Sequence, residues 1–419
     1  MKIAIIGAGI SGLGAAYLLH ENHDITVYEK NDYVGGHSRT IDVPLKSGKA
    51  PKVSPVDTGF IVFNNWNYPN LMGLFKTLNV PYQKSDMSFG VSIQDGWLEY
   101  GSDGMFAQKK NIFSPKYWGM LADIVKFNKQ ALAYIEKDPE ISLGQCLDEL
   151  NMGAWFRDYY LLAMGAAIWS CPIDTIMKFP AQTFLRFFKN HGLLSINNRP
   201  QWYTVTGGSR EYVSRLTAPF KDNINLNCGV SKVHRHEQKV IVVDDNGATA
   251  EYDEVIFGCH ADEALAIISD ASQQETQVLG NFQYQDNHIV VHSDKSFMPK
   301  TKKCWASWVY LSEARKDEKE CVSLTYWMNN LQGIDAHHPV FVTLNPGRRP
   351  DEDTIMDEHH FSHPIFDYGA ITAQPQIETI QGKDRLWFCG AYQRYGFHED
   401  GLMSAVNIVK AMGGTIPWA

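Results

Sequence analysis

The most concentrated chemistry in the sequence lies near its end, in the seven residues YGFHEDG from Tyr395 to Gly401. His398 offers an imidazole, and Glu399 and Asp400 offer carboxylates. These groups could transfer protons, hold a metal ion, or only begin a helix. We therefore treat His398 and Glu399 as candidate catalytic residues, and what they act on depends on the ligand that the rest of the chain binds.

A glycine pattern at the other end of the chain indicates that ligand. Gly7, Gly9 and Gly12 form a GxGxxG motif between an apolar run with β-branched residues, KIAII, and a segment with helical spacing. In a strand–turn–helix unit these glycines allow a tight turn, backbone approach to a pyrophosphate and close helix–strand packing. The helix N-terminus, with Ile10 and Ser11, would present its N–H groups to the phosphates.

A second predicted strand, Asp24–Glu29, ends in an acidic residue about 20 positions after the glycines. Glu29 is the residue type that meets a ribose hydroxyl in such units, and Lys30 follows it. The pattern therefore predicts a dinucleotide cofactor, either NAD or FAD. The alternative is a glycine-rich turn that binds nothing.

Composition limits the classes of protein to which this chain could belong. The chain has 419 residues, enough for two domains, and 44% hydrophobic with 20% charged residues is typical of a folded globular protein. A formal net charge of −9 argues against a nucleic-acid partner. The seven cysteines are widely spaced and form no CxxC pair, which favours a reducing compartment over a disulfide framework.

No targeting or membrane-spanning segment is expected. The glycine-rich start lacks a basic region and a cleavage site. The apolar run Tyr159–Trp169 is shorter than the roughly 18 residues that span a bilayer. We predict a cytoplasmic protein, either free or in peripheral contact with the inner membrane.

The residues after Glu29 carry a family resemblance. KNDYVGGHSRT, from Lys30 to Thr40, resembles the GGRxxT extension of the flavin-containing amine oxidase and phytoene desaturase superfamily. His37 stands where that family usually has arginine, and Arg39 follows two positions later. The resemblance implies FAD as the cofactor, with Gly36 and either His37 or Arg39 near its pyrophosphate.

Further stretches resemble the same superfamily across essentially the whole chain. In VDTGFIVFN the backbone at Thr58 and Gly59 would approach the isoalloxazine, although a plain β-turn explains that sequence as well. The resemblance also implies cofactor contacts at the backbone of Val230, at the end of a strand at Gly390, and at the start of a helix. That start would lie at Gly401, Leu402 and Met403, with Asp400 as the N-cap.

The superfamily usually places aromatic rings at the flavin face. Tyr392 and Tyr395 are the nearest matches, so the resemblance adds both to the candidate catalytic residues. A lysine near the flavin could correspond to Lys302 or Lys303, but two solvated loop lysines explain KK equally well.

The resemblance implies an α/β fold in which a Rossmann-type, amine-oxidase-like FAD domain is interleaved with a mixed α+β substrate domain. The FAD domain is expected in residues 1–75, 200–275 and 380–419, and the substrate domain in residues 76–199 and 276–379. Within the substrate part, Tyr117–Lys137 has the apolar period of an amphipathic helix, through positions 118, 121, 124, 125, 132 and 135.

A metal site is not predicted. In DEHHFSH, His359 and His363 have the i, i+4 spacing of helical ligands, but Pro350 and Pro364 bound a segment without apolar periodicity.

Several later stretches, including CVSLTYWMNNLQGI and GFHEDGL, resemble a bacterial group of predicted NAD/FAD-binding oxidoreductases associated with cyclopropane-fatty-acid synthase-like enzymes. This implies hydride removal from an apolar substrate, preferably desaturation or another modification of a fatty acyl chain, free or in phospholipid. A quinone, oxygen or another flavoprotein would accept the electrons. Amine oxidation and non-redox double-bond isomerisation are the alternatives.

Overall fold

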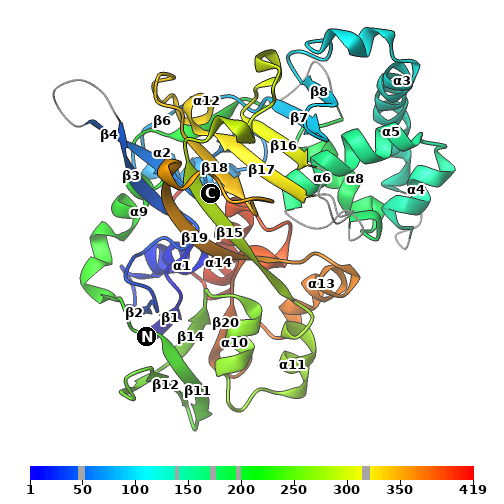
Figure 1. Cartoon of the computed structure of the whole chain (residues 1–419). Coiled ribbons are helices and arrows are strands. Elements are labelled where there is room, and N and C mark those ends of the chain that lie inside the picture. Colours follow the sequence, from blue (N-terminus) through cyan, green and yellow to red (C-terminus); the bar gives the residue numbers. More distant parts are fainter. Residues whose placement is uncertain (46–51, 137–140, 170–175, 195–199, 314–320) are drawn as a thin grey trace.

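The computed structural model describes residues 1–45, 52–136, 141–169, 176–194, 200–313 and 321–419. Its first layer is a five-stranded parallel sheet in the order β10-β2-β1-β14-β20. The strands are β1 (Lys2–Ile6), β2 (Asp24–Tyr28), β10 (Ile224–Asn225), β14 (Glu254–Phe257) and β20 (Leu386–Phe388). The predicted strand–turn–helix unit at the N-terminus is confirmed, and the sheet joins strands from both ends of the chain (Figure 1).

Helices pack on one face of this sheet. α1 (Ile10–Leu19), α2 (Pro69–Thr77), α9 (Arg210–Thr217) and α14 (His398–Ala411) share a buried apolar cluster with residues of β1 and β2. α1 and α14 lie side by side near the centre of Figure 1. Gly14 allows this close approach, because a Cβ there would lie 2.7 Å from Leu402 Cδ1.

The opposite face carries a second apolar cluster. It is covered by the antiparallel strands β11 (Val230–His236), β12 (Lys239–Asp244) and β13 (Thr249–Tyr252), and by the helices α10 (Ala261–Ile267), α11 (Gln273–Leu279) and α13 (Tyr368–Ala373). The turn at Asp245–Gly247 joins β12 and β13, and Gly247 has the positive φ, 81°, that such a hairpin needs.

The other large layer is a seven-stranded mixed sheet in the order β19-β15-β18-β17-β16-β7-β8. Its strands are β7 (Phe89–Ile93), β8 (Leu98–Gly101), β15 (Tyr284–His292), β16 (Trp308–Glu313), β17 (Cys321–Trp327), β18 (Phe341–Leu344) and β19 (Ile355–Pro364), with α12 (Met328–Gln332) after β17. Every strand comes from the two blocks predicted to form the substrate domain.

Two small sheets connect these layers. β3 (Thr40–Leu45) pairs with β4 (Lys52–Asp57), and β9 (Trp202–Val205) pairs with both β5 (Phe63–Asn64) and β6 (Tyr82–Ser85). The second sheet crosses the predicted boundary at residue 75. The domain limits therefore stay a prediction.

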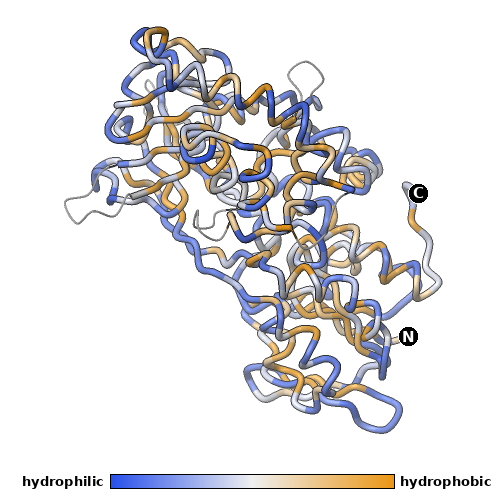
Figure 2. Tube along the Cα trace, turned by 90° about the vertical axis from the view of Figure 1, so that its right-hand side faces the viewer, coloured by the Kyte–Doolittle hydropathy of each residue, from blue (hydrophilic) through white to orange (hydrophobic). Residues whose placement is uncertain are grey.

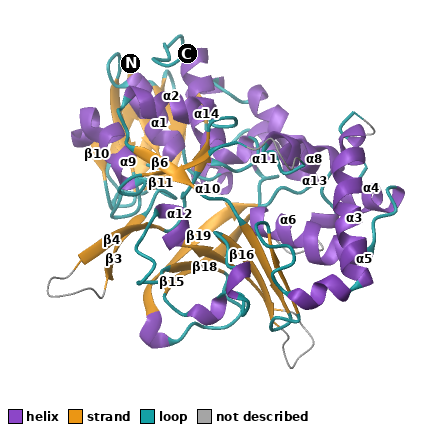
Figure 3. Ribbon diagram, turned by 90° about the horizontal axis from the view of Figure 1, so that it is seen from above, coloured by secondary structure: helices purple, strands orange, loops and turns teal. Residues whose placement is uncertain are grey.

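A helical lobe lies beside the mixed sheet, away from the parallel sheet (Figures 1 and 3). It contains α3 (Pro115–Gln130), α4 (Leu143–Glu149), α5 (Ala154–Phe156), α6 (Leu162–Trp169) and α8 (Ala181–Asn190) around their own apolar cluster. The predicted helix in Tyr117–Lys137 exists, but of its six predicted apolar positions only Leu121, Ile124 and Ile135 contact this cluster. Tyr117, Met120 and Phe127 are buried, whereas Trp118 and Val125 are exposed.

Hydrophobic residues are distributed along the whole trace (Figure 2). Within the part of the chain that the structure describes, no helix has the length and apolar character to cross a bilayer.

Candidate functional site

The GxGxxG turn has the geometry that cofactor binding requires. Gly7 has a φ of +101°, and a Cβ on Gly12 would lie 1.9 Å from the Gly7 carbonyl oxygen, so both positions depend on glycine. A Cβ on Gly9 would meet nothing within 4 Å, so the backbone there borders open space. The first N–H groups of α1, at Ile10, Ser11 and Gly12, have no acceptor within the helix.

The second glycine pair lies directly against the first. Gly35 donates its N–H to the Ala8 carbonyl at 2.8 Å, and a Cβ on Gly36 would lie 3.2 Å from the Gly9 Cα. The sequence places these turns about 26 residues apart, and the fold brings them together, as the predicted pyrophosphate site requires.

Glu29, predicted at the ribose, and Val230, whose backbone is predicted to contact the cofactor, are also neighbours. Glu29 is buried, and its carboxylate accepts hydrogen bonds from Ala8 N at 2.8 Å and from Asn31 N at 2.9 Å. Cys228 donates to the Glu29 carbonyl, which places the start of β11, at Val230, beside this end of the site. Lys30 forms an ion pair with Glu263.

The His37 side chain is half-buried, and its Nε2 is buried with no hydrogen-bond partner among the described residues. Its ring stacks on Phe361, with centroids 4.5 Å apart, and His363 lies 5.1 Å away. Burial and, to a smaller degree, the neighbouring imidazoles lower the pKa of His37 well below its ordinary value, so the ring is neutral.

Arg39 is engaged elsewhere. Its guanidinium makes two hydrogen bonds to Asp357 on β19, at 2.7 and 3.1 Å. The arginine therefore connects the glycine turn to the mixed sheet, and its predicted contact with the pyrophosphate stays a prediction.

The Asp-x-Gly turn is held by a buried network. Asp57 accepts hydrogen bonds from Ser209 N at 2.8 Å, from Thr40 Oγ1 at 2.6 Å and from Gln332 Nε2 at 2.8 Å. Burial raises the pKa of Asp57 to about 6 against these bonds. Thr58 and Gly59 pack directly against the segment His37–Arg39. The Thr58 N–H donates to the Arg39 carbonyl, and a Cβ on Gly59 would strike the His37 carbonyl.

The segment from Gly390 to Gly401 lies beside the start of α1. Gly390 donates its N–H to Ser404 Oγ at 2.9 Å, and a Cβ on Gly401 would lie 2.8 Å from Ser11 Oγ. The N-terminal turns of α1 and α14 are therefore in contact, and two helix N-termini meet at one point. Leu402 is buried in that contact, and Met403 is partly exposed.

The predicted helix start was wrong. α14 begins at His398, three residues before Gly401, and Phe397 is its N-cap. Asp400 is the third helical residue, and its Oδ2 accepts the Phe397 N–H at 2.9 Å and the Tyr395 N–H at 3.2 Å. A carboxylate at the third helical position accepts a hydrogen bond from the N-cap backbone N–H and so closes the first turn. From local sequence alone, an aspartate in this role cannot be distinguished from an aspartate at the N-cap itself.

Glu399 caps a different helix. It is 3% exposed, and its carboxylate accepts the N–H groups of Asn70 at 3.0 Å and Leu71 at 2.9 Å, together with Asn70 Nδ2 at 2.7 Å. These are first-turn donors of α2. Burial raises the pKa of Glu399 to about 7, although the hydrogen bonds act in the opposite direction.

His398 connects three segments. Its Nε2 lies 2.8 Å from Ser38 Oγ and 2.7 Å from the Tyr212 hydroxyl, and its ring stacks on Phe60 with centroids 3.8 Å apart. Burial lowers the pKa of His398 to about 3, so the imidazole is neutral.

Tyr392 and Tyr395 are not brought together. Tyr392 packs on Phe282 in the cluster beneath the far face of the parallel sheet, and its hydroxyl is buried without a partner. Tyr395 packs on Phe187 of α8, with centroids 5.8 Å apart. Of the two, Tyr395 lies at the contact between the helical lobe and α14.

The histidines of DEHHFSH lie on a strand, β19, where residues two apart share a face. His363 and Phe361 reach His37 in this way, and His260 follows β14 on the same side, 6.4 Å from His37. Sequence reasoning missed this cluster. The available signal was the position of His260 just past the carboxyl end of a parallel strand. Among the described residues no group of three His, Cys, Asp or Glu is arranged to hold a metal.

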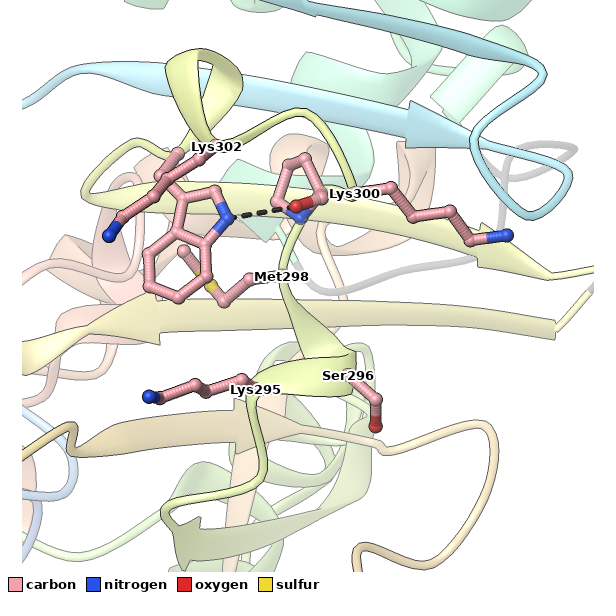
Figure 4. A pocket seen from close by; sticks show the side chains of 7 residues that line it. Lys295, Ser296, Met298, Lys300 and Lys302 are labelled. Carbon is pink, nitrogen blue, oxygen red and sulfur yellow. Dashed lines mark hydrogen bonds between the residues drawn. The ribbon is translucent and has the colours of Figure 1, made fainter.

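The described residues line at least two cavities that open at the surface. One of about 600 Å³ borders the second glycine turn, and its lining includes Tyr33, Ser38 and Arg39. The other, of about 420 Å³, lies on the mixed-sheet side and is lined by Met298, Trp305 and three lysines, including Lys302 (Figure 4). Lys302 and Lys303 are exposed there.

The comparisons with known proteins agree with this geometry. A family model described as flavin containing amine oxidoreductase matches residues 10–360. The chain therefore belongs to the flavin-containing amine oxidoreductase family, and FAD is its cofactor, as predicted. This confirms an enzyme of the flavoprotein oxidoreductase class at the level of the family.

Individual relatives differ in activity. A putative flavin-containing monoamine oxidase, AofH, from Mycobacterium tuberculosis is 24% identical over 262 residues, covering 59% of this chain and 54% of the relative. The chain thus spans about half the length of that relative. A 15-cis-phytoene desaturase from Synechococcus elongatus is 37% identical over 81 residues, covering 19% of this chain and 15% of the desaturase.

Solved structures show the same fold. The crystal structure of a CLA-producing fatty acid isomerase from P. acnes matches with a TM-score of 0.68 and 17% identity, covering 98% of each chain. The predicted α/β class with an FAD-binding domain is thereby confirmed.

The residues present fit FAD. The open space above Gly9, the unpartnered His37 Nε2 and the two converging helix N-termini all border the same turn. Glu29 accepts three hydrogen bonds, and a carboxylate has about four acceptor positions, so one remains for a ribose hydroxyl.

Proposed function

We propose that this protein is an FAD-dependent oxidoreductase that removes hydride from an apolar substrate, namely a fatty acyl chain, free or in phospholipid. Desaturation or another double-bond change is the proposed reaction. The observation that carries the proposal is an uncharged aromatic contact between α8 and the first turn of α14.

That contact is built from rings. Phe397 stacks on Phe187, with centroids 5.2 Å apart, and His191 stacks on Phe187 at 3.8 Å. Burial lowers the pKa of His191 to about 4, so it carries no charge at neutral pH. Tyr395 adds a fourth ring. Phe187 and His191 are buried in this contact and none of the rings carries a charge, so an adjoining site would suit an alkyl chain better than a solvated cation.

The nearby carboxylates are already occupied, which disfavours an amine substrate. An ammonium group requires an anionic or polar anchor. Glu399 accepts three hydrogen bonds from α2, and Asp400 accepts two backbone N–H groups and lies 3.6 Å from Arg394. Both carboxylates are buried and already accept hydrogen bonds from the protein, which makes each of them a poor anchor for a substrate cation.

When bound, FAD supplies the hydride acceptor, and a quinone, oxygen or second flavoprotein must take up the electrons afterwards. The protein's own residues bind and orient the cofactor. We propose that Gly7, Gly9, Gly12, Gly36 and the first N–H groups of α1 hold the pyrophosphate, that Glu29 holds the ribose, and that α14 directs its N-terminus at the ring. His398, neutral and half-buried, fixes the first turn of α14 through its contacts with Ser38, Tyr212 and Phe60.

Relatives support both lipid and amine chemistry. The phytoene desaturase and the fatty acid isomerase are named for changes to double bonds, and AofH is named as a monoamine oxidase. The association with cyclopropane-fatty-acid synthase-like enzymes and the cytoplasmic location stay predictions from the sequence.

Anaerobic mixing of the flavin-loaded protein with fatty acids, phospholipids and amines tests the proposal. Loss of the oxidised-flavin absorbance with a lipid, together with a product that has one more double bond, is the expected result. A shifted double bond without net reduction would identify an isomerase. Reduction by amines alone would identify an amine oxidase, and a colourless protein that takes up no FAD would refute the assignment.

A further inference from the structure

The outer surface of the helical lobe carries apolar side chains that no described residue covers. Thirteen large hydrophobic residues are exposed in the described part of the chain, and six of them lie between residues 106 and 132. These six are Phe106, Ile112, Phe113, Trp118, Val125 and Leu132, which we call the α3 surface together with the lysines named below. Isolated exposed hydrophobics are ordinary, but such a concentration marks an interaction site.

α3 has two apolar faces, and the fold uses one. Tyr117, Met120 and Phe127 face the core of the lobe. Trp118 and Val125 are seven residues apart, as are Val125 and Leu132, so they follow one line along the helix and the short 3₁₀ turn after it. The exposed line is therefore unnecessary for packing within this chain.

The exposed rings have fixed positions. Trp118 donates its Nε1–H to the Ile112 carbonyl at 2.9 Å, and the Phe106 ring lies 5.0 Å from the Trp118 ring. Phe113 is 85% exposed at the tip of the turn that precedes α3. A preformed aromatic surface of this kind loses little conformational entropy when it inserts into an apolar layer.

The charge of this surface is opposite to that of the whole protein. Lys109, Lys110 and Lys116 are exposed beside the rings, and the sequence contains no Asp or Glu from Gly104 to Ala122. Asp123, the acid that ends this stretch, accepts the Gly153 N–H at 2.9 Å. The chain as a whole carries a formal charge of −9.

A second basic segment adjoins the first. Lys302 and Lys303 are exposed in the turn Lys302–Cys304, and a Cβ on Gly104 would lie 3.2 Å from the Lys303 carbonyl oxygen. The lysines therefore come from two distant segments that meet at one edge of the α3 surface.

We propose that the α3 surface docks the protein peripherally on an anionic lipid bilayer. Tryptophan and phenylalanine enter the interface between head groups and acyl chains, and the lysines pair with lipid phosphates. A basic amphipathic face with aromatic residues on an otherwise acidic chain fits such a surface by both charge and polarity. The inference rests on α3 and its neighbours and does not depend on the proposed substrate.

Vesicle flotation tests the proposal with the flavin-loaded protein. Vesicles of phosphatidylcholine alone are compared with vesicles that also contain phosphatidylglycerol, at low and high salt. We expect binding to the anionic vesicles that salt weakens. Replacing Lys109, Lys110 and Lys116 together by glutamine should weaken it about 100-fold. The double variant Phe113→Ser, Trp118→Ser should weaken binding to a similar degree.

Matched controls change the same residue types elsewhere. Lys76, Lys221 and Lys232 are exposed on other elements, as is Trp66, and their replacement by glutamine and serine should leave binding unchanged. Circular dichroism and flavin content verify that each variant folds. The proposal is overturned if the wild type does not bind anionic vesicles, or if the α3-surface and control variants bind equally. It is also overturned if sedimentation shows a dimer that the Phe113→Ser, Trp118→Ser variant dissolves, because the surface would then join two copies.

Discussion

Replacing Glu399 separates a structural carboxylate from a catalytic one. In Glu399→Ala the two backbone N–H groups and one amide of α2 that it accepts would be left buried without acceptors. Each orphaned donor costs about 1 kcal/mol, so the free energy of unfolding should fall by about 3 kcal/mol. Glu399→Gln keeps one accepting oxygen and should cost about half as much.

The same residue predicts a pH dependence. Burial raises the pKa of Glu399 from its ordinary value of 4.5 to about 7, so the folded state retains a proton that the unfolded state releases. The stabilisation is present at acidic pH and is lost as the pH rises through the interval from about 4.5 to about 7. The destabilisation caused by Glu399→Gln should therefore be larger at about pH 5 than at about pH 8.

Urea unfolding followed by circular dichroism measures the stability, and anaerobic stopped-flow measures flavin reduction. A double-mutant cycle with Asn70→Ala isolates the 2.7 Å side-chain bond. We expect reduced stability with a reduction rate within about threefold of the wild type per bound flavin. Unchanged stability combined with a large loss of rate would refute the capping role and restore Glu399 as a catalytic residue.

Three further predictions follow from the site. Gly9→Ala should leave the apoprotein stable but raise the Kd for FAD at least about 10-fold, because its Cβ would enter the open space at the turn where the pyrophosphate is proposed to bind. Gly12→Ala should instead destabilise the apoprotein by about 3 kcal/mol, because its Cβ would strike the Gly7 carbonyl. Calorimetry of the apoprotein and of FAD binding distinguishes the two effects. Burial lowers the pKa of His398 to about 3, so its contribution to stability is present above about pH 6.5 and is lost as the pH falls, and His398→Phe should flatten acid unfolding between those values; an unchanged acid limb would contradict this. Asp357→Asn removes the ion pair with Arg39 and should lower the free energy of unfolding, measured by urea unfolding, by about 1 kcal/mol. An unchanged free energy of unfolding would show that this ion pair does not contribute to stability.

Local sequence patterns were sufficient for the first βαβ unit. Strand β1, the glycine turn and α1 are specified within about 20 residues by apolar periodicity and glycine positions, and so was the acidic residue at Glu29.

Contacts between residues distant in the sequence could not be predicted from local sequence patterns. The acceptors for first-turn donors of α2 come from Glu399, more than 300 residues later, and no local rule connects them. The exposed face of α3 has the same period as the buried one, so hydrophobicity alone could not say which face meets the core. The neighbours of His37 come from β19 and from the end of β14, which only the sheet order brings together.

The strand order of the parallel sheet also dictates when the molecule can fold. β1 is made long before its partners, because its neighbour β14 pairs on its other side with β20, at residues 386–388, and α1 packs on α14, at His398–Ala411. A ribosome must therefore synthesise β20 and α14 before the parallel sheet and the helices beside the glycine turn can assemble. FAD capture is then a late event, and deleting α14 should abolish flavin loading even though Gly7, Gly9, Gly12 and Gly36 are still present.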